Sequence, residues 1–175
     1  MRDNHLIILL IVAVAVARLL PHPFNFTPIG ALAMFSGAYV RDKRFLLLPL
    51  IALLLGDAVN GLYALSVMMM VYLGFMAQTL ISHRLLRLRV NLLRFVVTLV
   101  LGAITFYLVS NIGMWWYAYP LTAAGLIMCW VDGWPFLLSS MFGDLLYGSL
   151  MFGAVEWFKR NAQRQHHADG IAVQA

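Results

Sequence analysis

The chain has 175 residues, of which 63% are hydrophobic and only 11% are charged, and its mean hydropathy is +0.86. A soluble domain carries about 25% charged residues, so this composition excludes an ordinary soluble fold and favours an integral membrane protein. The formal net charge of +5 points to orientation in a bilayer more than to nucleic-acid binding. Cys129 is the single cysteine, which excludes an intrachain disulfide and a multi-cysteine zinc site.

Six apolar segments predict an all-α integral membrane protein, a bundle of six transmembrane helices in one membrane domain, residues 1–158. The first three segments are short against the roughly 20 residues that a bilayer requires, although short helices span where flanking side chains snorkel or the bilayer thins. A further apolar run, Tyr119–Val131, is expected to lie at the interface or to re-enter the membrane. The predicted spans are His5–Leu20, Phe26–Val40, Phe45–Val59, Leu62–Ser82, Leu92–Gly113 and Pro135–Phe158.

Positive charge gathers on one side of these spans. With the N-terminus inside, the cytoplasmic segments hold eleven of the twelve Lys and Arg residues, and Arg18 alone lies outside. The positive-inside rule predicts this distribution, so we expect both termini in the cytoplasm. The opening residues also fit a secretory signal that ends at Ala15-x-Ala17, and its cleavage would leave five spans with the same sidedness. The polar tail, residues 159–175, is expected to be disordered.

The predicted outer loops are rich in aromatic and amide side chains. They comprise Arg18–Thr27, the Asn60–Gly61 turn with Tyr63 after it, and a long loop, Ser110–Phe136, with four of the five tryptophans. Trp and Tyr favour the headgroup region whatever the function, so an aromatic belt is one interpretation. The other is a ligand pocket with apolar walls and a few polar groups. Because these residues gather at one interface, we favour the pocket and expect a planar or ring-bearing ligand.

Two aspartates fall inside predicted spans. Asp144 lies near mid-membrane, and Asp57 lies near the outer end of the third span. An intramembrane carboxylate is costly and by default suggests function. The alternative is a structural carboxylate with hydrogen-bonded neighbours, for which Ser139 or Ser140 could serve Asp144. Both interpretations stay open for Asp144, whereas a structural role is favoured for Asp57.

Three weaker patterns concern packing. Pro49–Gly61 resembles Pro135–Gly148, with a shared Gly-Asp pair, as inverted transporter repeats would. Ala13 and Ala17 form a small-residue face on the first span, which could pack within the bundle or against another membrane subunit. Glu156 is expected to pair with Arg160, four residues on.

Motifs for enzymatic chemistry are missing. The sequence has no phosphate loop, no H-E-x-x-H and no G-x-S-x-G, and its histidines are scattered or terminal. We therefore expect a protein that is not an enzyme, with no cofactor and no bound metal.

Three segments carry a family resemblance: "RLLPHPFNFTPIGALAMFSGAYV", "PLIALLLGDAVNGLY" and "NIGMWWYAYPLTAAGLIMCWVDGWPFLLSSMFGDLLYG". They cover about Arg18–Phe158 and resemble a family of small bacterial membrane proteins. That family is related to the substrate-binding S components of energy-coupling factor (ECF) vitamin transporters.

This resemblance implies a six-helix bundle of the bacterial cytoplasmic (inner) membrane that binds a vitamin-like micronutrient near the outer surface. It also implies that an alanine-rich face, here Ala13 and Ala17, docks on a transmembrane coupling subunit driven by two ATPases. Some S components for cobalamin use a cysteine as cobalt ligand, and Cys129 on the predicted outer side keeps cobalamin as a minor option, without a match in position. The resemblance places Asn25, Phe26, Asn111, Trp115 and Trp116 in pocket-forming loops.

The expected function is thus micronutrient capture by a membrane subunit that binds no nucleic acid. A proton-coupled secondary carrier that uses Asp144 and Asp57 is the alternative, followed by a structural membrane protein without ligand. The outer loops and the intramembrane carboxylate predict these substrate-binding residues: Asn25, Phe26, Asn60, Tyr63, Asn111, Trp115, Trp116, Tyr119, Trp134 and Asp144.

Overall fold

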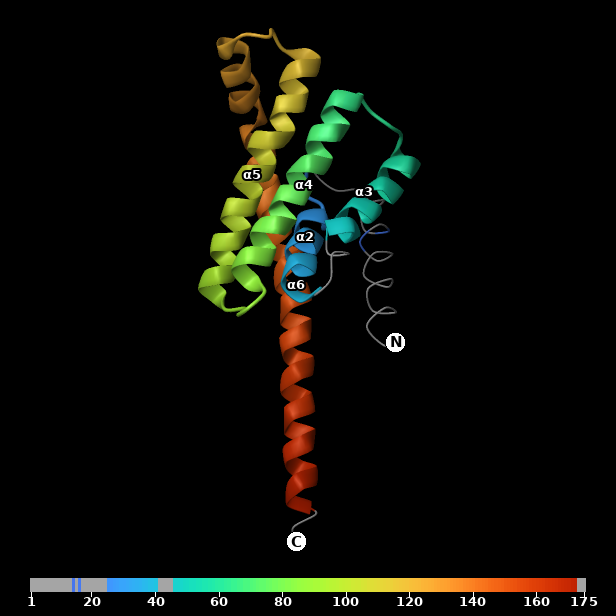
Figure 1. The fold of residues 1–175 in the computed structure, drawn as a ribbon, viewed down its shortest axis with the longest axis vertical. Helices are drawn as coiled ribbons and strands as arrows, with labels where there is room; N and C mark the ends of the chain where they lie inside the picture. Colours follow the sequence, from blue (N-terminus) through green and yellow to red (C-terminus); the bar gives the residue numbers. More distant parts are fainter. Residues whose placement is uncertain (1–13, 15, 17–24, 41–45, 173–175) are drawn as a thin grey trace.

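The computed structural model describes residues 25–40 and 46–172 together with Val14 and Val16, with side chains as far as residue 161. The first predicted span, His5–Leu20, with Ala13 and Ala17, otherwise lies outside the described residues. The described part is entirely helical (Figure 1), as the sequence predicts. Its helices are α2 (Ile29–Tyr39), α3 (Leu47–Asn60), α4 (Leu65–Leu86), α5 (Leu92–Ala118) and α6 (Ala123–Ala172).

Three helices are long and apolar enough to cross a membrane: α4, α5 and the Ala123–Asn161 part of α6. Large apolar side chains stay exposed along all three, for example Leu65, Leu101 and Phe142. Soluble proteins rarely leave so much contiguous apolar surface in water, and lipid is the environment that suits it. The chain is therefore an all-α membrane protein.

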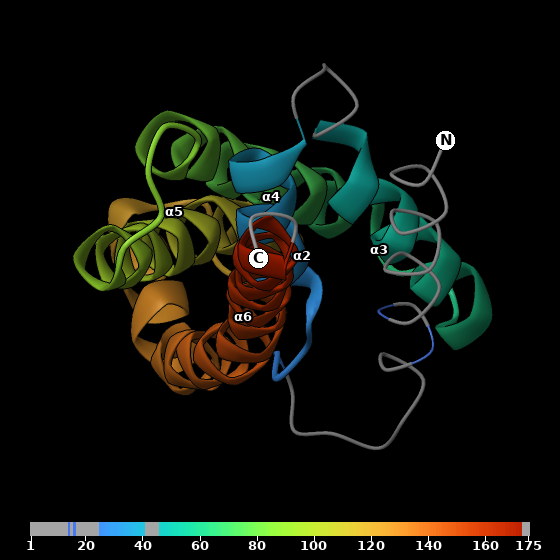
Figure 2. The same ribbon diagram turned by 90° about the horizontal axis from the view of Figure 1, so that it is seen from below.

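The short helix α2 forms the centre of the bundle (Figure 2). It contacts α3, α4, α5 and α6, and its residues from Ile29 to Ala38 are all buried. Gly37 permits close contact with α4, because a Cβ there would lie 2.5 Å from the carbonyl oxygen of Thr79. With 11 residues, α2 is about 16 Å long, roughly half of a hydrocarbon core of about 30 Å. Its first residues, Ile29 and Ala31, are fully buried, so the helix begins inside the bundle.

A helical hairpin replaces the predicted long outer loop. The helix α5 continues to Ala118 and α6 begins at Ala123, so the connection shrinks to residues 119–122 (Figure 1). The prediction of a loop at Ser110–Phe136 was therefore wrong. The apolar run Tyr119–Val131 contributes its residues from Ala123 onward to α6. Within the turn, Trp115 Nε1 donates to the carbonyl oxygen of Pro120 (2.8 Å), and Thr122 Oγ1 accepts from the backbone N–H of Gly125 (3.1 Å). These bonds satisfy polar groups that a helix end leaves open.

The helix α6 spans 50 residues, about 75 Å, and extends well beyond the other helices (Figure 1). It includes Pro135, which lacks an N–H for the helical ladder. Since it runs to Ala172, the prediction of a disordered tail was wrong. Lys159 Nζ lies 2.8 Å from Glu156 Oε1, so Glu156 pairs with Lys159 and not with Arg160. Spacings of three and four both allow a helical ion pair, and side-chain rotamers decide between them.

Candidate ligand cavity

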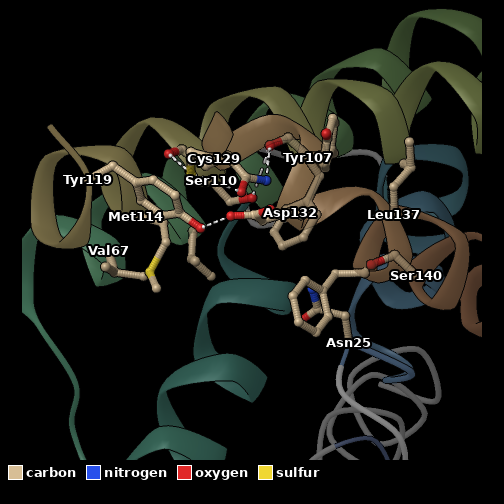
Figure 3. A pocket seen from close by; sticks show the side chains of 15 residues that line it. Asn25, Val67, Tyr107, Ser110, Met114, Tyr119, Cys129, Asp132, Leu137 and Ser140 are labelled. Atoms are coloured by element: carbon tan, nitrogen blue, oxygen red, sulfur yellow. Dashed lines mark hydrogen bonds between the residues drawn. The ribbon is translucent and has the colours of Figure 1, made fainter. Parts of the chain in front are cut away.

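A cavity of about 290 Å³ lies where α4, α5 and α6 meet, near the α5–α6 turn (Figure 3). Its walls are mostly apolar, with amide, hydroxyl and carboxylate groups among them, which is the usual make-up of a small-molecule site. The lining residues are Asn25, Val67, Val71, Phe106, Tyr107, Ser110, Asn111, Met114, Tyr119, Cys129, Asp132, Gly133, Phe136, Leu137 and Ser140.

Helical periodicity explains which side chains reach the cavity. On α6, Asp132, Phe136 and Ser140 are four residues apart and share one face, which Asp144 continues further down. On α5, the lining positions also recur every three or four residues, from Phe106 to Met114. Two helical stripes therefore face each other across the cavity.

One hydrogen bond links the α5–α6 turn to the cavity wall. Tyr119, in the turn, donates from its hydroxyl to Asp132 Oδ2 at 2.9 Å (Figure 3). This bond to the carboxylate raises the pKa of Tyr119 above its ordinary value of 10.0. The phenol therefore stays protonated at neutral pH and serves as the donor.

Asn111 connects the two helices of the hairpin. Its Nδ2 donates to the backbone carbonyl oxygen of Tyr107 (2.8 Å). The thiol of Cys129 donates to the backbone carbonyl oxygen of Asn111 (3.4 Å). Gly133 keeps room for the amide, because a Cβ at Gly133 would lie 2.7 Å from Asn111 Oδ1. The hydroxyl of Tyr107 also donates to the carbonyl oxygen of Trp130. These contacts hold α5 against α6 beside the cavity.

Asn25 lies on the opposite side of the cavity from Tyr119 (Figure 3). Its backbone φ is 61°, the left-handed region that asparagine adopts more readily than most residues. The residue precedes α2, and its conformation turns the chain into that helix. An uncommon backbone conformation beside a cavity is a feature that often accompanies function.

A second, smaller cavity of about 20 Å³ adjoins the first, because Asn25, Phe106 and Ser140 line both. Asp144 lines it and is only 3% exposed. Gln78 Nε2 donates to Asp144 Oδ2 at 2.8 Å, and the backbone N–H of Ala31 donates as well. Gly30 makes this approach possible, since a Cβ there would lie 2.1 Å from Asp144 Oδ1.

Asp144 therefore caps the first turn of α2 from another helix. A carboxylate at this position satisfies an N–H that the helix leaves open and stabilises the positive end of the helix dipole. The sequence suggested Ser139 or Ser140 as partners, whereas Gln78 and Ala31 are the donors to Asp144.

The structure brings four of the predicted site residues to these cavities. Asn25, Asn111 and Tyr119 line the larger one, and Asp144 lines the smaller one. Phe26 packs instead against Tyr147 of α6, with 5.8 Å between the ring centroids.

The other predicted residues point elsewhere. Trp115 bonds to the turn, while Trp116 and Trp134 are 63% and 55% exposed and line neither cavity. Asn60 ends α3, before the predicted turn at Gly61, whose φ of 101° requires glycine. Tyr63 follows this turn and donates to Asp57 Oδ2 at 3.4 Å.

Sequence reasoning missed Phe106, Ser110, Met114 and Phe136 as lining residues, and it did not place Asp132 in the site. The sequence did contain a helical pattern that indicates this face, because Asp132, Phe136, Ser140 and Asp144 follow one another at intervals of four residues. It was hidden because residues 110–136 were interpreted as a loop, where helical spacing has no meaning. Within the described residues, no group of three metal-ligating side chains lies together.

The fold and the site together define a class of protein: an all-helical membrane protein with a partly polar cavity beside a helical hairpin. Residues 1–166 match the family described as "Family of unknown function (DUF6580)", and the chain belongs to that family. No curated protein and no solved structure gives a match.

Proposed function

We propose that this protein is a substrate-binding membrane subunit that captures a vitamin-like micronutrient, in the manner of an ECF S component. One observation supports this most: three residues predicted for the site from separate segments, Asn25, Asn111 and Tyr119, line one cavity of about 290 Å³. That volume is close to the lower end of the range for small-molecule sites, about 300 Å³.

The proposal includes a topology and partners. The chain would cross the bacterial inner membrane six times with both termini in the cytoplasm, and the cavity would face outward. Ala13 and Ala17 would dock on a transmembrane coupling subunit that two ATPases drive. The positive-inside distribution of Lys and Arg supports this sidedness.

Native mass spectrometry of the full chain, purified in mild detergent, tests the proposal. We expect a discrete added mass from a bound small molecule. Asn25→Gly should remove or reduce it, because glycine keeps the positive φ and deletes only the amide. Met114→Trp should also remove it, because the larger side chain occupies space inside the cavity.

Trp134→Phe is the matched control. This residue lies on α6 close to the cavity, but its side chain is 55% exposed and does not line it. The bound mass should persist in this variant. A clean apo mass for the unmodified chain, unchanged after exposure to a panel of vitamins, would contradict the proposal and favour a structural protein without ligand.

A proton-coupled secondary carrier is the second candidate, favoured by one observation: Asp144 lines a cavity that adjoins the larger one. Such a carrier would use Asp144, with Asp57, to relay protons. Asp144→Asn separates the two candidates in reconstituted vesicles. It should abolish pH-dependent uptake in a carrier, but it should leave or only weaken equilibrium ligand binding in a capture subunit.

A further inference from the structure

We propose that the larger cavity selects small ring-bearing cations, and that Asp132 is the carboxylate that binds the cationic group. This inference rests on the proposed function and names the substrate class of the same site. Three features carry it: the charge of the lining, the state of the two aspartates, and the size and aromatic character of the space.

The larger cavity has one acidic side chain, Asp132. None of the described residues that line it is Lys, Arg or His. Arg18, the single basic residue predicted for the outer side, lies outside the described residues. A carboxylate attracts a cation and repels an anion, and no basic side chain among the described lining residues offsets its charge.

Asp144 and Asp132 differ in their hydrogen-bond partners and in their exposure. Asp144 accepts hydrogen bonds from Gln78 and from the backbone of α2, so its carboxylate already has a structural role. Asp132 accepts a hydrogen bond from the neutral hydroxyl of Tyr119, and Asp132 is an exposed residue. A ligand ammonium would bring a full positive charge to this carboxylate, which the neutral hydroxyl of Tyr119 does not supply. Asp132 is therefore the carboxylate that a cation can reach.

The walls suit a flat ring. Phe106, Tyr107 and Phe136 line the cavity together with Asp132 and Asn25. An engineered cavity of about 150 Å³ accommodates benzene, so about 290 Å³ is enough for a ligand of one or two rings. Aromatic faces also attract a cation directly, whereas a carboxylate or phosphate on the ligand would meet no positive partner among the described lining residues.

Three matched probes test the charge preference: 1-naphthylmethylamine, 1-naphthalenemethanol and 1-naphthoate, titrated into the full chain in detergent by calorimetry. They share one ring system and carry a positive, a neutral and a negative group at pH 7. We expect the amine to bind about tenfold more tightly than the alcohol, because the ammonium forms an ion pair with the Asp132 carboxylate whereas the neutral alcohol only donates a hydrogen bond to it. The naphthoate should bind most weakly.

Asp132→Asn should bring the affinity for the amine down to that for the alcohol and leave the alcohol unchanged. Glu156→Gln, the same change on a distant part of α6, is the control and should preserve the tenfold difference. If Asp132→Asn does not fold, Tyr119→Phe gives an independent test. Deletion of the competing hydroxyl should strengthen binding of the amine by about threefold and spare the alcohol.

The outcomes separate the two proposals. Equal or tighter binding of the alcohol or the naphthoate would overturn the cation preference but leave a ligand-binding cavity. Equal losses for all three probes in Asp132→Asn would also overturn the role of Asp132. Failure of every probe to bind, together with a clean apo mass, would overturn the proposed function as well.

Discussion

Asp57 and Asp144 look alike in the sequence and differ in the structure. Each follows a glycine within an apolar helix, and each is almost fully buried, at 1% and 3% exposure. Asp57 lies three residues from the end of α3 and accepts from the hydroxyls of Tyr63 (3.4 Å) and Tyr72 (3.1 Å). Asp144 lies deep within α6 and accepts from an amide and from the first turn of α2.

The difference shows that a buried acid in a membrane helix does not define a role by itself. The hydroxyls around Asp57 can rotate and can accept as well as donate. The N–H of Ala31 is fixed by the helix and can only donate. Asp144 joins the first turn of α2 to a cavity, so it contributes both to the stability of the bundle and to the shape of the site.

Among the substitutions that separate the Asp57 and Asp144 sites, Gly30→Ala should have the largest effect on stability. It affects the Asp144 site only. The new Cβ would lie 2.1 Å from Asp144 Oδ1, so the buried carboxylate would have to shift and give up its present hydrogen bonds. We expect a loss of about 3 kcal/mol in the free energy of unfolding, measured by denaturant titration in detergent. Gly153→Ala is the control, since its Cβ would meet nothing within 4 Å, and it should stabilise slightly.

Asp144→Ala and Asp57→Ala compare the two sites directly. Deletion of the Asp144 carboxylate leaves a buried amide and a buried N–H without this acceptor, so we expect a loss of about 2–3 kcal/mol. For Asp57 we expect about 1 kcal/mol, because the tyrosine hydroxyls can turn to other partners. The same titration measures both losses. Equal values would show that the helix cap does not distinguish the two sites.

Substitutions of the tyrosines sharpen the Asp57 half of the comparison. Tyr72→Phe removes the shorter bond and should cost about 1 kcal/mol. Tyr63→Phe should cost less, because its bond to Asp57 is longer and its side chain is 37% exposed. Thermal melting of the two variants side by side checks this order, and the reverse order would contradict it.

Asn25→Gly should have the smallest effect on folding, within about 0.5 kcal/mol, because glycine adopts a φ of 61° without strain. The adjoining cavities nevertheless lose an amide, so ligand binding should fall while the melting temperature does not. Asn25→Val should instead destabilise the fold by about 1–2 kcal/mol, because a branched side chain disfavours this φ. If glycine proved as harmful as valine, the amide and not the backbone would hold the turn.

Local sequence was sufficient where a residue has few options. Long apolar runs such as Leu92–Gly113 predict helices because an unbonded backbone is too costly in lipid. At the predicted Asn60–Gly61 turn, α3 ends at Asn60 and Gly61 has a positive φ, which glycine adopts without strain. Aromatic and polar content led to the wrong interpretation of residues 110–136, because Trp, Tyr and Pro occur at membrane interfaces in helices and loops alike.

The sequence by itself determined that this is a helical membrane protein, where most of its helices lie, and that Asn25, Asn111 and Tyr119 are candidate site residues. Only the tertiary structure decided that α5 and α6 form a hairpin, so that Asp132 and Ser140 meet those three at one cavity. It alone decided that Asp144 caps α2 while Asp57 accepts from tyrosines. The physical reason is that composition controls burial in lipid, whereas the partners of a buried polar group come from distant segments that only packing brings together.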